Sequence, residues 1–205
     1  MKVGILAVQG DFEAHGEMLA RMGVEHRFVF RPADLAGCSA LILPGGESTT
    51  QLQFLQEEGL FEGIARFAER GGAILGTCAG TILLAREVHN PSQPSLGLLD
   101  IDVARNAYGR QIASEVKWGA TKLKNEPLEM VFIRAPIIER VGPGVEVLAE
   151  SEGHPVLVRC GRMMAATFHP ELTDDPTVHA EFLKLADSSD TAYANRGATS
   201  EVVPT

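Results

Sequence analysis

The sequence predicts an α/β fold in which a central, mostly parallel sheet carries added antiparallel strands. Short apolar segments alternate with helix-length segments through residues 3–86, which is typical of a parallel sheet covered by helices. From residue 99 to residue 167 the segments become short and rich in Val and Ile, as antiparallel or mixed strands are. A chain of 205 residues with 45% hydrophobic content is long enough for one core and requires no second domain.

The N-terminal elements follow from apolar runs and turn signals. Residues 3–8 form a continuous apolar run, as expected of a strand buried on both faces. Asp11 is a candidate N-cap for a helix that Gly23 ends. We expect further strands at residues 25–30 and 40–43, and helices at about 49–57 and 60–70.

The stretch at residues 71–80 predicts a strand, a sharp turn and a helix. Its core, Gly76-Thr77-Cys78-Ala79-Gly80, has the G-x-C-x-G form of a nucleophile elbow, in which glycines allow a strained turn that exposes the central side chain. The turn would also place Cys78 near a helix N-terminus, which favours a thiolate. Cys78 is therefore a candidate nucleophile. A buried free cysteine is the commoner role, and the turn alone leaves both interpretations open.

The second half of the chain predicts mainly strands. After a helix at about residues 79–86, a polar loop at 90–94 carries no catalytic signal. We expect strands, added to the central sheet, at residues 101–105, 131–134, 145–148, 156–159 and 163–168. A closing helix at 176–186, with Pro near its first turn, precedes a polar tail at 187–205 that we expect to be disordered.

Charge and cysteine content exclude several classes of partner. The net charge is −9, so a nucleic-acid partner, which requires a basic patch, is not expected. Cys38, Cys78 and Cys160 form no CxxC pair and no zinc-like spacing, which suggests a reducing compartment. The N-terminus lacks the order of a signal peptide, and no apolar run approaches the ~18 residues of a membrane span. We expect a cytoplasmic protein without a membrane partner.

A thiol nucleophile also requires a base, and His169 is the candidate. It follows an apolar strand, and Glu171 lies two residues further on, where its carboxylate could hold one imidazole tautomer. A structural histidine is the alternative interpretation. The remaining histidines have no comparable partner, and we interpret them as surface or local hydrogen-bonding groups: His15, His26, His89, His154 and His179.

The loop at residues 44–48 is a second candidate ligand-binding feature. Its adjacent glycines, Gly45 and Gly46, allow the backbone to approach a ligand closely. It follows an expected parallel strand, where open α/β sheets place their ligands. The spacing and lysine of a Walker A loop are absent. An ordinary strand-to-helix turn, capped by its Ser and Thr residues, is the alternative.

These residues together resemble a known family. The elbow with His169-Pro170-Glu171 resembles the Cys-His-Glu triad of class I glutamine amidotransferases. Longer strings resemble the glutaminase subunits of pyridoxal 5′-phosphate synthase: LAVQG at 6–10, LPGGESTT at 43–50, RNAYGRQ at 105–111, FIRAP at 132–136 and FHPELT at 168–173. The resemblance runs from about residue 3 to residue 185 and leaves out the polar tail.

The resemblance implies a three-layer, flavodoxin-like amidotransferase fold, with a glutaminase domain at residues 1–186. It implies that Cys78 attacks the side-chain amide of L-glutamine, that His169 transfers protons and that Glu171 orients His169. The implied oxyanion hole consists of backbone N–H groups of Gly46 and Ala79. The implied glutamine-binding residues are Gly46, Glu47, Ser48, Arg105, Ile133 and Arg134.

The resemblance also implies a partner and no cofactor or metal. The partner is a (β/α)₈-barrel synthase subunit that receives the ammonia, in a large ring assembly of twelve plus twelve subunits. Gln9 and Gly10 match the loop that the family places at this interface. Two alternatives remain open: a glutaminase subunit of another amidotransferase, such as imidazole glycerol phosphate synthase, and a catalytically silent regulatory subunit on the same fold.

Overall fold

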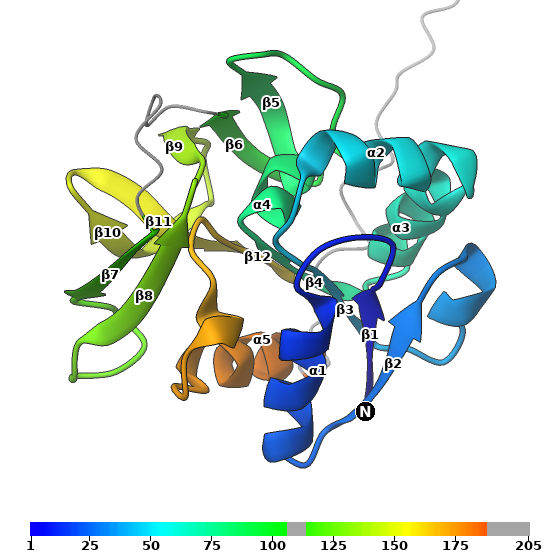
Figure 1. The fold of residues 1–205 in the computed structure, drawn as a ribbon, viewed down its shortest axis with the longest axis horizontal. Helices are drawn as coiled ribbons and strands as arrows, with labels where there is room; N and C mark the ends of the chain where they lie inside the picture. The colour runs from blue at the N-terminus through cyan, green and yellow to red at the C-terminus, as the bar shows by residue number, and fades with distance from the viewer. Residues whose placement is uncertain (106–113, 188–205) are drawn as a thin grey trace, which may run out of the picture.

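A computed structural model describes residues 1–105 and 114–187, and its centre is a seven-stranded sheet (Figure 1). Its strands are β1 Lys2–Leu6, β2 Glu25–Val29, β3 Ala40–Leu43, β4 Ala73–Thr77, β10 Glu146–Ser151, β11 His154–Cys160 and β12 Met163–Ala166. They lie in the order β10-β11-β12-β4-β3-β1-β2. From β12 to β2 every neighbouring pair is parallel, whereas β10–β11 and β11–β12 are antiparallel. The predicted fold class is therefore confirmed.

Helices cover both faces of this sheet and complete three layers (Figure 1). They are α1 Phe12–Arg21, α2 Ser48–Glu57, α3 Leu60–Glu69, α4 Ala79–Leu84 and α5 Thr177–Asp187. Leu41 and Leu43 of β3 pack with residues of α2, α3 and α4, whereas Ala40 and Ile42 pack with residues of α1 and α5. Alternate residues of one strand thus enter opposite cores, which explains why the parallel strands are continuously apolar.

Two small sheets correct the expected strand pairing. β5 Ala85–His89, β6 Leu99–Ala104 and β9 Ile137–Val141 form one sheet, and β7 Ser114–Gly119 with β8 Leu128–Ile133 forms another. The strands expected at 101–105 and 131–134 were wrongly assigned to the central sheet. Alternate residues of β6 and of β8 are buried. Each of these strands therefore packs only one face against a core, whereas a strand inside the central sheet is buried on both faces.

Other differences are local. The sequence prediction missed β5, β7 and β9. The helix expected to reach residue 86 ends at Leu84, because the chain continues directly into β5, which pairs with β6. Of the string at 105–111 only Arg105 falls within the described residues, and the expected tail lies outside them apart from Asp187. Within the described ranges, no helix combines the length and apolar character that crossing a membrane requires.

The strand order determines where the site forms. β1, β3, β4 and β12 are neighbours and parallel, so their C-terminal ends lie along one edge of the sheet. Gln9, Gly46, Cys78 and His169 each follow one of these four strand ends. This edge is where open α/β sheets bind ligands. Four segments far apart in sequence are thereby brought together.

Candidate active site

Cys78 occupies a strained turn between β4 and α4. Its φ of 46° and ψ of −102° are unusual for a residue with a side chain. A Cβ on Gly76 would lie 2.6 Å from the carbonyl carbon of Gly80, and a Cβ on Gly80 would lie 1.9 Å from the oxygen of Leu43. The turn therefore closes only with glycine at both positions. This is the strand–turn–helix geometry that the G-x-C-x-G pattern predicts.

The thiol of Cys78 lies at the floor of the site. It is 6% exposed, and Sγ donates a hydrogen bond to the backbone oxygen of Ile133 at 3.8 Å. Its backbone N–H is already bonded to the oxygen of Ala166 at 2.8 Å. The next N–H, that of Ala79, opens the first turn of α4, where intrahelical acceptors are lacking. The thiol thus stands beside a backbone donor that can face a bound ligand.

His169 and Glu171 form a buried pair next to Cys78. Nδ1 of His169 and Oε1 of Glu171 are 2.8 Å apart, and both residues are buried. Burial would lower the pKa of His169, but the adjacent Cys78 and Glu171 side chains outweigh it and raise the pKa to about 10. Burial would raise the pKa of Glu171, but the neighbouring His15 and His169 hold it below its usual value. The pair therefore favours an imidazolium beside a carboxylate.

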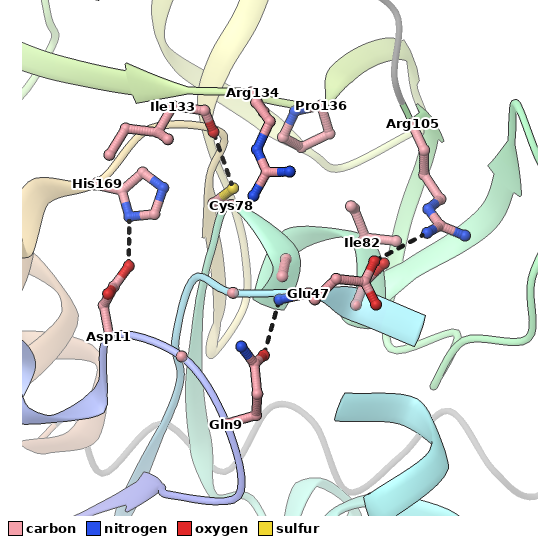
Figure 2. A pocket seen from close by; sticks show the side chains of 14 residues that line it. Gln9, Asp11, Glu47, Cys78, Ile82, Arg105, Ile133, Arg134, Pro136 and His169 are labelled. Atoms are coloured by element: carbon pink, nitrogen blue, oxygen red, sulfur yellow. Dashed lines mark hydrogen bonds and ion pairs between the residues drawn. The ribbon is translucent and has the colours of Figure 1, made fainter. Parts of the chain in front are cut away.

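The second ring nitrogen of His169 is available for chemistry. Nε2 is buried, and it has no hydrogen-bond partner among the described residues. Figure 2 shows the imidazole beside Cys78 at the wall of the pocket. Because Glu171 engages Nδ1, Nε2 is the atom that can exchange a proton with the thiol or with a ligand. Its burial beside the cavity makes Nε2 the candidate atom for proton transfer.

A cavity of about 290 Å³ joins the predicted residues (Figure 2). This is near the lower end of the roughly 300–1,000 Å³ usual for small-molecule sites, which suits a ligand of amino-acid size. Most residues of its walls are site residues that the sequence indicated: Gln9, Gly10, Gly46, Glu47, Ser48, Cys78, Ala79, Arg105, Ile133, Arg134 and His169. The other three are Asp11, Ile82 and Pro136. Glu171 does not line the cavity because it lies behind His169.

The polar wall of the cavity contains two guanidinium groups in different settings. Arg105 is buried; its Nη2 donates to Oγ1 of Thr49 at 2.9 Å and lies 3.5 Å from Oε1 of Glu47. Arg134 is exposed, has a φ of 45°, and takes part in no ion pair with the described residues. Arg105 is thus partly neutralised, whereas Arg134 offers its charge to a ligand.

Residues after β3 form the loop opposite Cys78. Gly46 has a φ of 152°, and a Cβ there would lie 2.5 Å from Oε1 of Gln9. Glu47 caps α2, since its Oε2 accepts from the N–H of Thr50 at 3.0 Å. The expectation that Ser or Thr caps this helix was wrong. Ser48 is buried and donates to Oε1 of Gln93 at 3.2 Å.

The structure corrects the interpretation of two histidines. His15 and His179 are completely buried, and Nδ1 of His15 lies 2.9 Å from Nε2 of His179 across 164 residues. Nε2 of His15 lies 3.1 Å from Oγ1 of Thr77 and 3.4 Å from Oε2 of Glu171. They are neither surface groups nor locally bonded. The helical spacing of apolar residues does not indicate contacts between side chains that lie so far apart in the sequence.

Asp11 is another residue whose role the sequence did not indicate. It stands at the N-cap position of α1 but makes no capping hydrogen bond through its side chain. Instead, Oδ2 lies 3.6 Å from Nδ1 of His169 (Figure 2). Asp11, His169 and Glu171 place ligand atoms within 4.8 Å of one another. A metal there would have to displace the hydrogen bond between His169 and Glu171, so the arrangement fits an oriented base better than a metal centre.

The chain is similar to known proteins over most of its length. A family model described as the SNO glutamine amidotransferase family matches residues 5–187. A relative from Koribacter versatilis, named pyridoxal 5′-phosphate synthase subunit PdxT, is 53% identical over 185 residues, 90% of this chain and 95% of the relative. A relative of the same name from Thermus thermophilus is 52% identical over 189 residues, 90% of this chain and 97% of the relative.

Solved structures extend the comparison. One described as a glutamine amidotransferase has a TM-score of 0.84 at 48% identity and covers 90% of this chain and 98% of its own. PurLQS from Thermotoga maritima has a TM-score of 0.64 at 20% identity, and the match covers 89% of this chain and 97% of the PurLQS chain. At that identity the second likeness concerns the fold alone.

Proposed function

The chain belongs to the SNO glutamine amidotransferase family, and from this premise we propose that it is the glutaminase subunit of a pyridoxal 5′-phosphate synthase. Residues 1–186 constitute its glutaminase domain, which hydrolyses L-glutamine to L-glutamate and ammonia. Curated relatives at about 50% identity that bear this name support the assignment.

One observation carries the chemical proposal: the unpartnered Nε2 of His169 and the thiol of Cys78 line one cavity of amino-acid size. A thiol, a base and an orienting carboxylate are the components of nucleophilic acyl transfer. Glu171 supplies the third, at 2.8 Å from Nδ1 of His169. We assign the catalytic triad to these three residues.

The reaction proceeds in two steps. Sγ of Cys78 attacks the side-chain amide carbon of glutamine, and its proton reaches the departing nitrogen through Nε2 of His169, which releases ammonia and leaves a glutamyl thioester. Water then attacks the thioester while Nε2 accepts its proton, and the carbon–sulfur bond breaks to give glutamate and the thiol. Glu171 stabilises the imidazolium that each step uses.

Backbone donors stabilise the oxyanion of each step. The N–H of Ala79 opens α4, directly after the nucleophile, as in other nucleophile elbows. The N–H of Gly46 comes from the opposite loop, where the absence of a Cβ permits close approach. These donors face the ligand from two sides of the cavity, so both loops must keep their positions for the reaction to proceed.

Charged and polar walls recognise the amino-acid part of glutamine. Arg134, with no ion pair to the described residues, binds the α-carboxylate through its fork of donors. Glu47, held near Arg105, faces the α-ammonium. Gly46, Ser48 and Ile133 complete the substrate-binding walls.

The ammonia passes to a partner synthase subunit, which we propose to be a (β/α)₈ barrel in a ring of twelve plus twelve subunits. Gln9 and Gly10, on the loop after β1 that lines the cavity, form the contact that couples docking to the site. The three cysteines are free thiols, which fits a protein of the reducing cytoplasm.

A coupled assay tests this function. The purified chain is mixed with the synthase barrel, and glutamate and pyridoxal 5′-phosphate are measured with glutamine as the only nitrogen source. Formation of both products supports the proposal. Glutamate formation only with a different acceptor enzyme would assign the chain to another amidotransferase, and failure of a glutamine-analogue electrophile to label Cys78 in the complex would indicate a silent subunit.

A further inference from the structure

One oxygen of the triad carboxylate faces a buried histidine. Oε1 of Glu171 binds His169, whereas Oε2 is buried and has no hydrogen-bond partner among the described residues. The nearest ionisable nitrogen is Nε2 of His15, 3.4 Å away, and both side chains are fully buried. We propose, on the basis of the glutaminase function above, that His15 is a positioning residue that fixes and keeps ionised the carboxylate of Glu171, and through it orients His169.

The tautomer of His15 follows from its surroundings. A carboxylate oxygen at 3.4 Å favours a hydrogen on Nε2, because a lone pair there would face negative charge. This N–H donates to Oγ1 of Thr77, 3.1 Å away, while Nε2 keeps its electrostatic contact with Oε2 of Glu171 at 3.4 Å. Nδ1 of His15 consequently accepts from Nε2 of His179 at 2.9 Å. If Nδ1 of His15 carried the hydrogen instead, Nε2 of His179 would have to accept it. The hydrogen of His179 would then sit on its buried Nδ1, which has no hydrogen-bond partner among the described residues, and that arrangement costs more free energy.

Three elements hold this chain of hydrogen bonds. His15 comes from α1, His179 from α5 and Thr77 from the last residue of β4, immediately before Cys78. α1 and α5 lie on the same face of the sheet (Figure 1). This arrangement brings Nδ1 of His15 to 2.9 Å from Nε2 of His179. The position of Glu171 is thereby tied to the same strand that ends in the nucleophile.

Both outer histidines are neutral in this arrangement. Burial lowers the pKa of His15, and burial together with His15 lowers the pKa of His179 to about 3. The groups that face His15 are Glu171, His169, Asp11 and His179. Arg21 further opposes a charge on His179. His15 therefore acts as a neutral donor and not as a second proton carrier.

Loss of this donor has a defined chemical consequence. A buried carboxylate with fewer donors binds a proton more readily. Without this donor the pKa of Glu171 rises, so Glu171 becomes neutral at a higher pH than in wild type, and a neutral Glu171 no longer stabilises the imidazolium of His169. The change moves the acidic limb of the rate profile to higher pH and leaves glutamine binding intact, because His15 does not line the cavity. A residue that only fills space would lower the folded fraction without moving that limb.

The test compares His15→Phe, which retains a ring without a donor, with His15→Gln, which retains a donor near the position of Nε2. His154→Phe, on the exposed side of β11, is the matched control. Glutamate release by the complex with the synthase is measured from pH 4 to pH 9, and rates are normalised to folded sites by thermal melting and by titration of Cys78 with an electrophilic glutamine analogue.

We expect His15→Phe to lower kcat by about 10- to 100-fold, the range seen when outer partners of metal-bound histidines are removed, with KM within about twofold. Its acidic limb moves to higher pH by about one unit, and His15→Gln recovers most of the rate. An unchanged profile for His15→Phe, or no rescue by Gln, would overturn the inference. An inactive wild-type complex would instead contradict the proposed function.

A second variant covers the case in which His15→Phe does not fold. His179→Leu leaves His15 in place but removes the donor that fixes its tautomer. The same shift of the acidic limb is expected, with a smaller loss of kcat. A wild-type profile in folded His179→Leu would also overturn the inference.

Discussion

Oε1 of Gln9 accepts a hydrogen bond from the backbone N–H of Glu47 at 2.8 Å, joining residues 38 positions apart. The side chain of Gln51 strengthens this connection, since its Nε2 donates to the backbone oxygen of Gln9 at 3.0 Å and to that of Pro44 at 3.2 Å. The loop after β1 and the loop after β3 are therefore one hydrogen-bonded unit. We therefore expect a movement of the Gln9 loop to displace Gly46, the proposed oxyanion donor.

Gln9→Ala removes the side-chain half of this unit. We expect kcat for glutamate release by the complex to fall by about tenfold, less than the roughly 10²–10³ of a direct oxyanion donor, because Gln9 acts through the backbone. The control is Gln53→Ala, since Gln53 is exposed on α2 and bonds only Glu57 among the contacts described for its side chain, at 2.8 Å. Equal rates for the two variants would contradict this role of Gln9.

Gly45→Ala tests the close contact between the loop and the base. A Cβ on Gly45 would lie 2.3 Å from Cε1 of His169, so the imidazole must move away from Glu171 or the loop must open. We expect a loss of kcat of at least about 100-fold, the contribution typical of a general base. Gly63→Ala in α3, where the nearest atom would be 3.3 Å away, should retain activity. Wild-type kcat in folded Gly45→Ala would exclude this contact.

Gly80→Ala tests the tight packing of the elbow. The new methyl group would lie 1.9 Å from the backbone oxygen of Leu43, which cannot rotate away. We expect the free energy of unfolding to fall by about 3 kcal/mol, the upper part of the range for overpacking. For a chain of this size that loss lowers Tm by roughly 6–12 °C. Calorimetry provides the measurement, and an unchanged Tm would show that the elbow relaxes at no cost.

The buried histidines predict how stability depends on pH. The pKa of His179 is about 3 in the folded chain and near 6.5 when unfolded, so its stabilising effect is complete above pH 6.5 and is lost as the pH falls. Between these values the free energy of unfolding should decrease by about 1.4 kcal/mol per pH unit for this residue. Urea unfolding of wild type and of His179→Gln at pH 7, 6 and 5 measures this pH dependence of the free energy of unfolding. Parallel pH dependences would contradict a neutral buried His179.

The sequence indicated the site wherever the signal was local. Gly76 and Gly80 bracket Cys78 because the turn has no room for a Cβ, and that restriction is visible as a pattern. Glu171 lies two residues from His169, so their pairing could be proposed from spacing. The glycines after β3 were informative for the same reason, since a close backbone contact leaves no room for a Cβ and so requires glycine.

Long-range contacts left no such pattern. His15 and His179 meet across 164 residues, and periodicity places each of them on a helix without saying what lies opposite. Strands β6 and β8 show the alternation of one-sided burial, yet nothing local tells whether they extend the central sheet or form separate ones. Pairing depends on where the whole chain packs.

Glutamate release by the synthase complex containing Cys78→Ala shows whether Cys78 is the nucleophile. Cys160→Ala is the matched control, because Cys160 is another free thiol, on β11, that does not line the cavity. We predict that Cys78→Ala abolishes glutamate release, while Cys160→Ala retains the wild-type rate. Glutamate release by folded Cys78→Ala at a rate comparable to wild type would contradict it.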